Sequence, residues 1–283
     1  MLGVIGGTGL YDLPGLKDVS EIALDTPYGA PSSPIVRGSI AGAEVAFLAR
    51  HGRGHAINPS EIPFQANIHA LKQLGVTHLL SVNAVGSLRE HLAPRTAVIP
   101  DQVIDRTVGR PRTFFENGIV AHVGMADPFC GAFRRRVAHH ARDAQEMVQE
   151  GGTYICIEGP QFSTRAESEL YRQWGADIIG MTAMPEARLA REAGLCYASL
   201  AMVTDFDVWH EHEDDVTIEV VKRVLSENIE TGRQVIGQLA AEGLPACETG
   251  CAHAGRSALT TDPDHIAPDV RERLAVILSD VEQ

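Results

Sequence analysis

The chain has 283 residues, 44% of them hydrophobic, and a formal net charge of −13 at pH 7. This length and apolar content allow one large α/β domain or two small domains. The negative charge argues against nucleic acid or an anionic membrane as a partner, because both bind basic surfaces. No apolar run approaches the roughly 20 residues of a membrane span, and a signal-peptide pattern is absent. The five cysteines are an odd number, so we expect a reduced, cytoplasmic protein.

Short apolar runs rich in β-branched residues alternate with helical patterns along the chain. We expect strands over 2–7, 44–50, 78–86, 97–105, 153–160, 176–181 and 196–205, and helices over 63–75, 164–175, 185–194 and 217–243. This alternation predicts a single α/β domain with a central mixed, mostly parallel sheet flanked by helices. We place the domain at residues 1–242 and interpret residues 243–283 as a C-terminal tail, because a loop-like stretch begins there.

Polar segments directly follow six of these strands, and ligands in such sheets collect at the carboxyl ends of strands. The segments are Gly6 to Gly9, Arg50 to His51, Asn83 to Gly86, Glu158 to Ser163, Met181 to Thr182 and Thr204 to Asp207. We therefore expect them to form one composite site.

The glycine turn after the first strand does not match a dinucleotide-binding fingerprint. Gly7 and Gly9 are followed by three residues, 10–12, without the third glycine of G-x-G-x-x-G. A nicotinamide cofactor is therefore not expected. The turn is either a plain tight turn or a cradle of backbone N–H groups for an anion.

Four basic side chains lie within six residues at the end of the strand 44–50: Arg50, His51, Arg53 and His55. In a chain this acidic, such a cluster predicts a phosphate or carboxylate site. The alternative is a solvated charged turn. A site is favoured because Arg50 and His51 end an apolar strand.

Asp205 and Asp207 flank Phe206 at the end of another apolar strand. If the strand continues through Phe206, both carboxylates lie on one face. Two such carboxylates raise each other's pKa, so one can hold a proton near neutrality and act as a general acid. The spacing alone leaves open that they are solvated loop acids, or one cap and one salt bridge.

No metal site is expected. Cys247, Cys251 and His253 have a C-x3-C spacing in the tail but lack a fourth ligand. The segment 210–215 lacks the H-E-x-x-H spacing and is better interpreted as an acidic loop.

Taken together, these segments resemble the 5'-methylthioadenosine phosphorylase branch of the trimeric purine nucleoside phosphorylase family. The motifs GVIGGTGLYD, RHGRGH, NAVGSLRE, DQVIDRT, EGPQFSTRAES, GMTAMPEARLAREAG and TDFDVW follow the family's order within residues 2–242. The resemblance implies reversible phosphorolysis, in which phosphate attacks C1' of a purine nucleoside and releases the base. It implies no metal and no organic cofactor.

The resemblance also implies roles for the matching positions. Phosphate would be bound at Thr8, Arg50, His51, Asn83, Ala84 and Thr182. Met181 would lie against the ribose, and Phe162 and Ser163 would border the base, although from its loop position alone Phe162 could equally pack locally. Asp205 would assist protonation of the leaving adenine at N7 and, with Asp207, accept hydrogen bonds from the 6-amino group. Members that use 6-oxopurines have asparagine in place of Asp205, so the pair indicates a 6-aminopurine.

The pocket for the 5' substituent is expected from Ile218 and Val221 of the long helix and from His122 of an adjacent subunit. A site completed by a neighbour implies an obligate oligomer, here a cyclic homotrimer. Lys222 stands where an apolar residue is expected, so another small 5'-deoxy substituent is an alternative to methylthio. Asn83 replaces the family's usual threonine, which affects the details of phosphate binding.

Three alternative functions differ in what they require of these residues. A phosphorylase for 6-oxopurine nucleosides is disfavoured by Asp205. A hydrolase would use water, so Arg50, His51 and Thr182 would be superfluous. A nucleoside-binding protein without activity would keep Phe162 and the base contacts but show no turnover.

Overall fold

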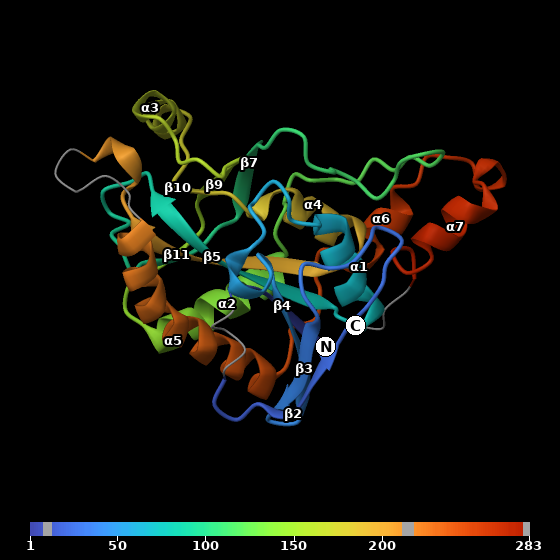
Figure 1. Cartoon of the computed structure of the whole chain (residues 1–283), viewed down its shortest axis with the longest axis horizontal. Helices are drawn as coiled ribbons and strands as arrows, with labels where there is room; N and C mark the ends of the chain where they lie inside the picture. The colour runs from blue at the N-terminus through green and yellow to red at the C-terminus, as the bar shows by residue number, and fades with distance from the viewer. Residues whose placement is uncertain (8–12, 211–217, 280–283) are drawn as a thin grey trace.

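The computed structural model describes residues 1–7, 13–210 and 218–279, and between 218 and 228 it describes the backbone only. A mixed sheet lies at the centre with helices on both faces (Figure 1). Its strands are β1 (Leu2–Gly6), β2 (Lys17–Ile22), β3 (Ile35–Ile40), β4 (Ala43–Ala49), β5 (His78–Ser87), β6 (Ala97–Ile99), β7 (Gln102–Arg106), β8 (Val148–Glu150), β9 (Thr153–Ile157), β10 (Ile178–Gly180) and β11 (Cys196–Asp205). The helices are α1 (Phe64–Gln73), α2 (Gly131–Ala144), α3 (Arg165–Gln173), α4 (Ala183–Glu192), α5 (Ile218–Glu242), α6 (Ala254–Ser257) and α7 (Pro268–Leu274).

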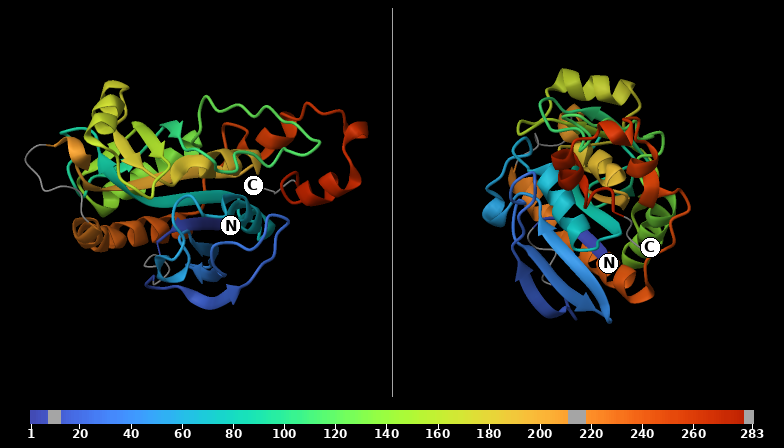
Figure 2. Two further views of the ribbon diagram at one scale, coloured as in Figure 1. Left: turned by 45° about the horizontal axis from the view of Figure 1, so that its top comes forward. Right: turned by 90° about the vertical axis from the view of Figure 1, so that its right-hand side faces the viewer.

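The strand order is β2-β3-β4-β1-β5-β10-β9-β7, and the sheet branches at β5. There β11 also pairs with β5, and β6 and β8 continue from β11. The pairs β1–β4, β1–β5, β5–β11, β9–β10, β7–β9 and β6–β8 are parallel, and the remaining pairs are antiparallel. The predicted mixed, mostly parallel sheet is confirmed. Figure 2 shows β2, β3 and β4 on one side of the molecule and the segment after α5 at one end.

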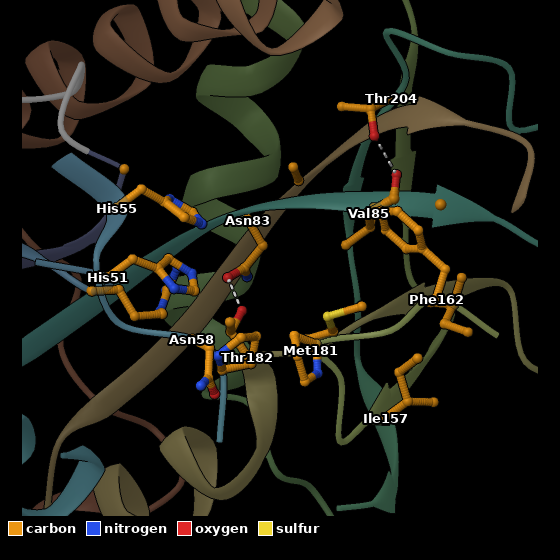
Figure 3. A pocket seen from close by; sticks show the side chains of 18 of the residues that line it. His51, His55, Asn58, Asn83, Val85, Ile157, Phe162, Met181, Thr182 and Thr204 are labelled. Carbon is orange, nitrogen blue, oxygen red and sulfur yellow. Dashed lines mark hydrogen bonds between the residues drawn. The ribbon is translucent and has the colours of Figure 1, made fainter. Parts of the chain in front are cut away.

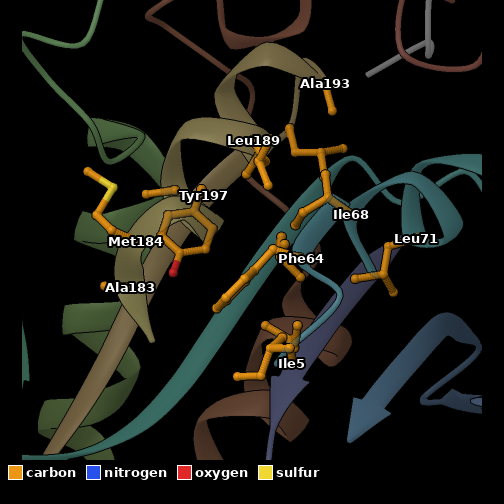
Figure 4. Packing of buried hydrophobic residues seen from close by; sticks show 14 of the residues in the cluster. Ile5, Phe64, Ile68, Leu71, Ala183, Met184, Leu189, Ala193 and Tyr197 are labelled. Carbon is orange, nitrogen blue, oxygen red and sulfur yellow. The ribbon is translucent and has the colours of Figure 1, made fainter. Parts of the chain in front are cut away.

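The central strands are buried on both faces because their side chains alternate between two cores. In β11, Tyr197, Ala201 and Val203 face one core, which α1 and α4 complete (Figure 4). Ala198 and Leu200 face the other core, which α2 and α5 cover. This explains why these strands appear in the sequence as continuous apolar runs rather than as alternating patterns.

The four predicted helices are present as α1, α3, α4 and α5. The capping box of α3 forms as predicted: the Thr164 hydroxyl accepts from the Glu167 backbone N–H at 3.2 Å, and the Glu167 carboxylate accepts from the Thr164 backbone N–H at 2.8 Å. Met184 is extended, with φ −119° and ψ 137°, so regular helical geometry in α4 begins at Pro185.

One predicted strand is divided in the structure. Residues 97–105 form β6, which pairs with β11 and β8, and β7, which pairs with β9. Pro100 lies between them, and a proline has no N–H to donate to a sheet. The hairpin β2–β3 and helix α2 were not predicted. All six β2 residues are exposed or half-buried, so β2 has no alternating pattern of buried residues. Helix α2 does have an apolar face, formed by Ala132, Phe133, Val137, Ala138 and Ala141, but it also carries many charged side chains.

The segment after α5 packs on the rest of the chain. The Pro245 carbonyl lies 2.9 Å from Nε2 of His78, and α6 packs against α4. Val270 and Leu274 of α7 are buried in the core that contains α1 and α4. The boundary at residue 242 stays a prediction. Within the described residues, no helix is long and apolar enough to cross a membrane.

Candidate active site

A cavity of about 650 Å³ opens at the carboxyl ends of the central strands. Residues from all six predicted polar segments line it: Gly7, Arg50, His51, Asn83, Ala84, Phe162, Ser163, Met181, Thr182, Asp205 and Asp207. The single composite site expected from the sequence is therefore present. Its volume suits a drug-sized or nucleoside-sized ligand.

The cavity begins where part of one edge of β5 has no neighbouring strand. On one edge, β1 pairs with β5 up to Ser81, and β10 pairs with β5 only at Gly86 and Ser87. Between these pairings, residues 82–85 have an open backbone edge. Ala84 is exposed there, although it lies in the middle of the sheet. Such an opening at a change of strand partner is where α/β sheets bind ligands.

Arg50 enters the cavity wall from the end of β4 and is held by a buried network. Its side chain is 3% exposed and forms an ion pair with the fully buried Glu186 of α4, with Nε 2.9 Å from Oε2. Nη2 donates to Glu186 Oε1, Ser81 Oγ and the Ile5 carbonyl, and Nη1 donates to the Val82 carbonyl. An arginine has five N–H donors, so these bonds leave one hydrogen on Nη1 for a ligand.

His51 and His55 lie beside this network with their rings stacked, 4.2 Å between centroids. Nδ1 of His51 lies 2.9 Å from the Ile57 carbonyl. Because a carbonyl can only accept, Nδ1 carries the proton and Nε2 is left as an acceptor. Burial, and then the neighbouring Arg50, lower the pKa of His51 to about 4. The unliganded site therefore holds a neutral imidazole at pH 7.

Asn83 and Thr182 face each other across the cavity floor (Figure 3). The Thr182 hydroxyl donates to Oδ1 of Asn83 at 2.9 Å, and Nδ2 of Asn83 donates to the Ser199 hydroxyl at 2.7 Å. Both side chains are buried. An anion bound here gains the Thr182 hydroxyl as a donor only if this hydroxyl turns away from Asn83.

Asp205 and Asp207 are both 8% exposed at the opposite end of the cavity. The strand does not continue through Phe206 as supposed. It ends at Asp205, and a 3-10 turn, η2 (Asp207–Trp209), begins with Asp207 in the left-handed region at φ 35°. Oδ1 of Asp205 accepts from the Asp207 backbone N–H at 3.0 Å, and Oδ2 accepts from the Thr204 hydroxyl at 2.7 Å. The tight turn therefore places the Asp205 carboxylate against the Asp207 backbone, while the Asp207 carboxylate accepts a hydrogen bond from the Ser168 hydroxyl at 2.5 Å.

The pKa of Asp207 is raised above its ordinary value, mainly by burial, while hydrogen bonds from Ser168 and the Val208 backbone oppose the shift. Glu167 adds a smaller upward contribution. The sequence had suggested that each aspartate raises the pKa of the other. The structure instead assigns most of this shift to burial.

The side chains at this end of the cavity are less polar. In Figure 3, Phe162 and Ile157 lie apart from His51 and Asn83, and Met181 lies between the two groups, next to Thr182. Phe162 is 46% exposed at the rim. Within the described residues, Oγ of Ser163 is buried without a hydrogen-bond partner, as expected of a group that meets a ligand.

The cavity thus has two chemically different ends. One end combines a cation and polar groups with an open backbone edge, which suits an anion such as phosphate. The other combines an apolar wall, a buried acid pair and an unpaired hydroxyl, which suits a planar heterocycle that carries amino and ring-nitrogen groups. A ligand that spans both ends would place its middle portion beside Met181.

Comparison with known proteins agrees with this arrangement. The family model described as "Phosphorylase superfamily" matches residues 1–241. The chain belongs to the phosphorylase superfamily. It is 55% identical over 278 residues to the S-methyl-5'-thioadenosine phosphorylase of Chloroflexus aurantiacus, which covers 98% of this chain and 96% of that relative.

Two solved structures show the same fold. A methylthioadenosine phosphorylase from an antarctic soil metagenomic library is 48% identical, with a TM-score of 0.93 and 98% of both chains covered. A variant of the adenosine/methylthioadenosine phosphorylase of Schistosoma mansoni, solved in complex with methylthioadenosine, is 35% identical with a TM-score of 0.80. That match covers 99% of this chain and 98% of the Schistosoma chain.

Some predicted residues of this phosphorylase lie elsewhere. His122 lines a separate, smaller cavity with Thr113 and Glu192, so within one chain it does not reach the main cavity. Its expected contribution to an adjacent subunit stays a prediction. Thr8 lies outside the described residues, and so do the side chains of Ile218 and Val221.

The sequence analysis missed several residues that position the site in this phosphorylase. Glu186 holds Arg50, and the buried Arg110 donates to the carbonyls of Met181 and Met184 at 2.8 and 2.7 Å. Arg110 thereby positions the segment that carries Met181 and Thr182. Nothing local distinguishes Glu186, because α4 carries three other charged residues and the partner Arg50 lies 136 positions away.

Proposed function

We propose that this chain catalyses the reversible phosphorolysis of 5'-methylthioadenosine to adenine and 5-methylthioribose 1-phosphate. The proposal rests on one cavity that has two different ends. The anion-binding end is formed by Arg50, His51, Asn83 and Thr182, and the other end by Asp205 and Asp207. The names of relatives such as the Chloroflexus enzyme support the same reaction.

The reaction follows from this geometry. An oxygen of phosphate attacks C1' of the ribose, the C1'–N9 bond breaks, and its electron pair moves into the departing purine. The purine is a poor leaving group unless N7 gains a proton, which is the role of a general acid. We assign this proton to the aspartate pair, with Asp205 placed at N7. Burial raises the pKa of Asp207, which is the direction that favours proton uptake by the pair.

The same carboxylates select the base. Both are buried, and a buried acceptor that meets the carbonyl of a 6-oxopurine instead of an amino group is left unpaired, at a cost of about 1–3 kcal/mol. Adenine offers a 6-amino donor, which matches them. The arrangement therefore favours 6-aminopurine nucleosides.

We further propose a cyclic homotrimer, because His122 lies outside the main cavity of its own chain and a second copy would have to supply it. The five cysteines are all free thiols, which fits the cytoplasm. The proposed enzyme is a pentosyltransferase of purine and methionine salvage. Phosphate is its co-substrate, and the chemistry uses no organic cofactor.

The test is adenine release from 5'-methylthioadenosine with and without phosphate, with adenosine and 5'-methylthioinosine assayed in parallel. We expect release that requires phosphate and favours methylthioadenosine. Equal release without phosphate would instead make the protein a hydrolase. Turnover of methylthioinosine alone would contradict the role of Asp205, and no turnover of any nucleoside would leave a binding protein.

A further inference from the structure

Four of the five cysteines meet at one place in the fold, although they are spread over the sequence. Cys130 is the N-cap of α2, Cys196 is the first residue of β11, and Cys247 and Cys251 lie in the segment after α5. Their four Sγ atoms all lie within 4.8 Å of one another. Cys130, Cys196 and Cys251 are at most 1% exposed, and Cys247 is half-buried.

The backbone holds this cluster in place from three directions. The Cys130 backbone N–H donates to the Tyr197 carbonyl at 2.8 Å, which fixes the start of α2 beside the start of β11. The Cys251 backbone N–H donates to Sγ of Cys247 at 3.2 Å and closes the C-x3-C turn. Gly250, directly before Cys251, is left-handed at φ 67°, a conformation that glycine adopts without strain.

A cationic side chain and a hydroxyl group lie beside the sulfurs. Nη1 of Arg191 donates to Sγ of Cys251 at 3.3 Å, and the Thr249 hydroxyl lies 3.3 Å from the same sulfur. Four thiol sulfurs therefore face one another beside a cationic side chain, an arrangement in which a metal ion can replace the thiol protons.

We propose that Cys130, Cys196, Cys247 and Cys251 bind one Zn²⁺ ion in a closed, tetrahedral site. Zinc bound by thiolates at about 2.3 Å places the sulfurs about 3.8 Å apart, so the observed cluster needs only a small contraction. A spacing of two to four residues within a ligand pair is usual, and C-x3-C meets it. Binding forms four Zn–S bonds and releases the thiol protons to solvent. The guanidinium of Arg191 offsets part of the resulting negative charge.

This zinc site departs from the expectation that the chain has no metal site. The sequence offered Cys247 and Cys251 without a complete ligand set, because Cys130 and Cys196 are far away in the chain. Folding supplies the two missing ligands. Neither pair alone would indicate a metal, since zinc needs four ligands in a structural site.

The role of this zinc is structural. None of the four cysteines lines the catalytic cavity, and Cys196 lies at the opposite end of β11 from Asp205. The ion would join α2, β11 and the segment after α5. That segment continues to Leu259, which bridges Ala121 next to His122. Loss of zinc should therefore loosen residues 244–262 first.

The experiment uses the full chain, purified under reducing and oxygen-free conditions without chelators. We expect about one zinc per chain by elemental analysis. Replacement by Co²⁺ should give the sulfur-to-metal charge-transfer band and the intense visible absorption of a tetrahedral thiolate site. Removal of zinc should lower the Tm and increase hydrogen exchange in residues 244–262.

Two matched variants decide whether these cysteines are the ligands. Cys247→Ser alters the most exposed of the four and should bind zinc far more weakly. Cys156→Ser alters the one cysteine outside the cluster, which is buried in β9, and should keep full zinc. Equal zinc content in both variants would overturn the proposal.

Two further outcomes would also overturn it. One is a folded wild-type chain that contains no zinc and takes up none from one equivalent of Zn²⁺ under reducing conditions. The other is freshly purified protein whose mass shows disulfides among these four cysteines. Both outcomes are independent of phosphorolysis, so the zinc site and the proposed activity can fail separately.

Discussion

Replacement of Glu186 by glutamine tests the buried network behind the anion-binding end of the cavity. Glu186 is completely buried, and its carboxylate accepts hydrogen bonds from Arg50 at 2.9 and 3.2 Å, from Ser81 at 2.6 Å and from Tyr197 at 2.9 Å. Glu186→Gln keeps the shape of the side chain but removes its charge. Arg50, itself 3% exposed, is then a buried cation without a counter-charge.

The magnitude follows from this burial. Removal of one partner of a buried ion pair costs about 3–5 kcal/mol, because the remaining charge is left uncompensated. Domains are stable by only about 5–15 kcal/mol, so this is a large share of the total. We expect the Tm to fall on the order of 10 °C. If Arg50 also contacts phosphate, added phosphate should restore part of this loss, because a bound anion supplies the missing charge.

The assay is urea and thermal unfolding of wild type and variant at pH 7, with and without phosphate. The matched control is Glu192→Gln, which makes the same change on the same helix. Burial is the main cause that raises the pKa of Glu192 to about 7, so its carboxyl is already partly neutral at pH 7. Its donors are the Thr113 hydroxyl and the Phe114 backbone N–H. We expect this control to change the unfolding free energy by about 1 kcal/mol or less.

Two results would refute this reasoning. One is a decrease in the free energy of unfolding of Glu186→Gln that is no larger than the decrease in Glu192→Gln. That result would show that Glu186 does not balance the charge of Arg50. The other is equal stabilisation of wild type and Glu186→Gln by phosphate. That result would place phosphate away from Arg50.

Three further predictions concern other parts of the site. Asp205→Asn should shift preference from methylthioadenosine toward methylthioinosine, and unchanged kcat/KM ratios would contradict the base-selection argument. Gly86→Ala places a Cβ 3.0 Å from Oδ1 of Asp205 and should lower kcat/KM roughly 10- to 100-fold, whereas Gly237→Ala, with no atom near its Cβ, should leave it unchanged in the same assay. His51 has a pKa of about 4 in the folded chain, below its ordinary 6.5. As the pH falls, the His51 side chain is therefore protonated in the unfolded chain before it is protonated in the folded chain. Stability present above pH 6.5 should therefore be lost as the pH falls toward 4, by at most about 3 kcal/mol. Urea unfolding of His51→Gln across this range should show a correspondingly weaker pH dependence, and an identical dependence would contradict the lowered pKa.

The sequence by itself determined the features that depend on near neighbours. The capping box of Thr164 and Glu167, the apolar strand before Asp205 and the basic residues after β4 are local patterns, and the structure contains each of them. The position of the site also followed, because polar residues at the carboxyl ends of parallel strands must meet at one edge of the sheet.

Only the tertiary structure decided which distant residues meet. Strand order, the open edge of β5, the pairing of Arg50 with Glu186 and the gathering of four cysteines all join positions far apart in the chain. A residue carries no local mark of such a partner, because burial, charge compensation and metal-ligand geometry arise only when the chain has packed. The same cause explains the pKa shifts of His51, Asp207 and Glu192, each of which has burial as its largest contribution.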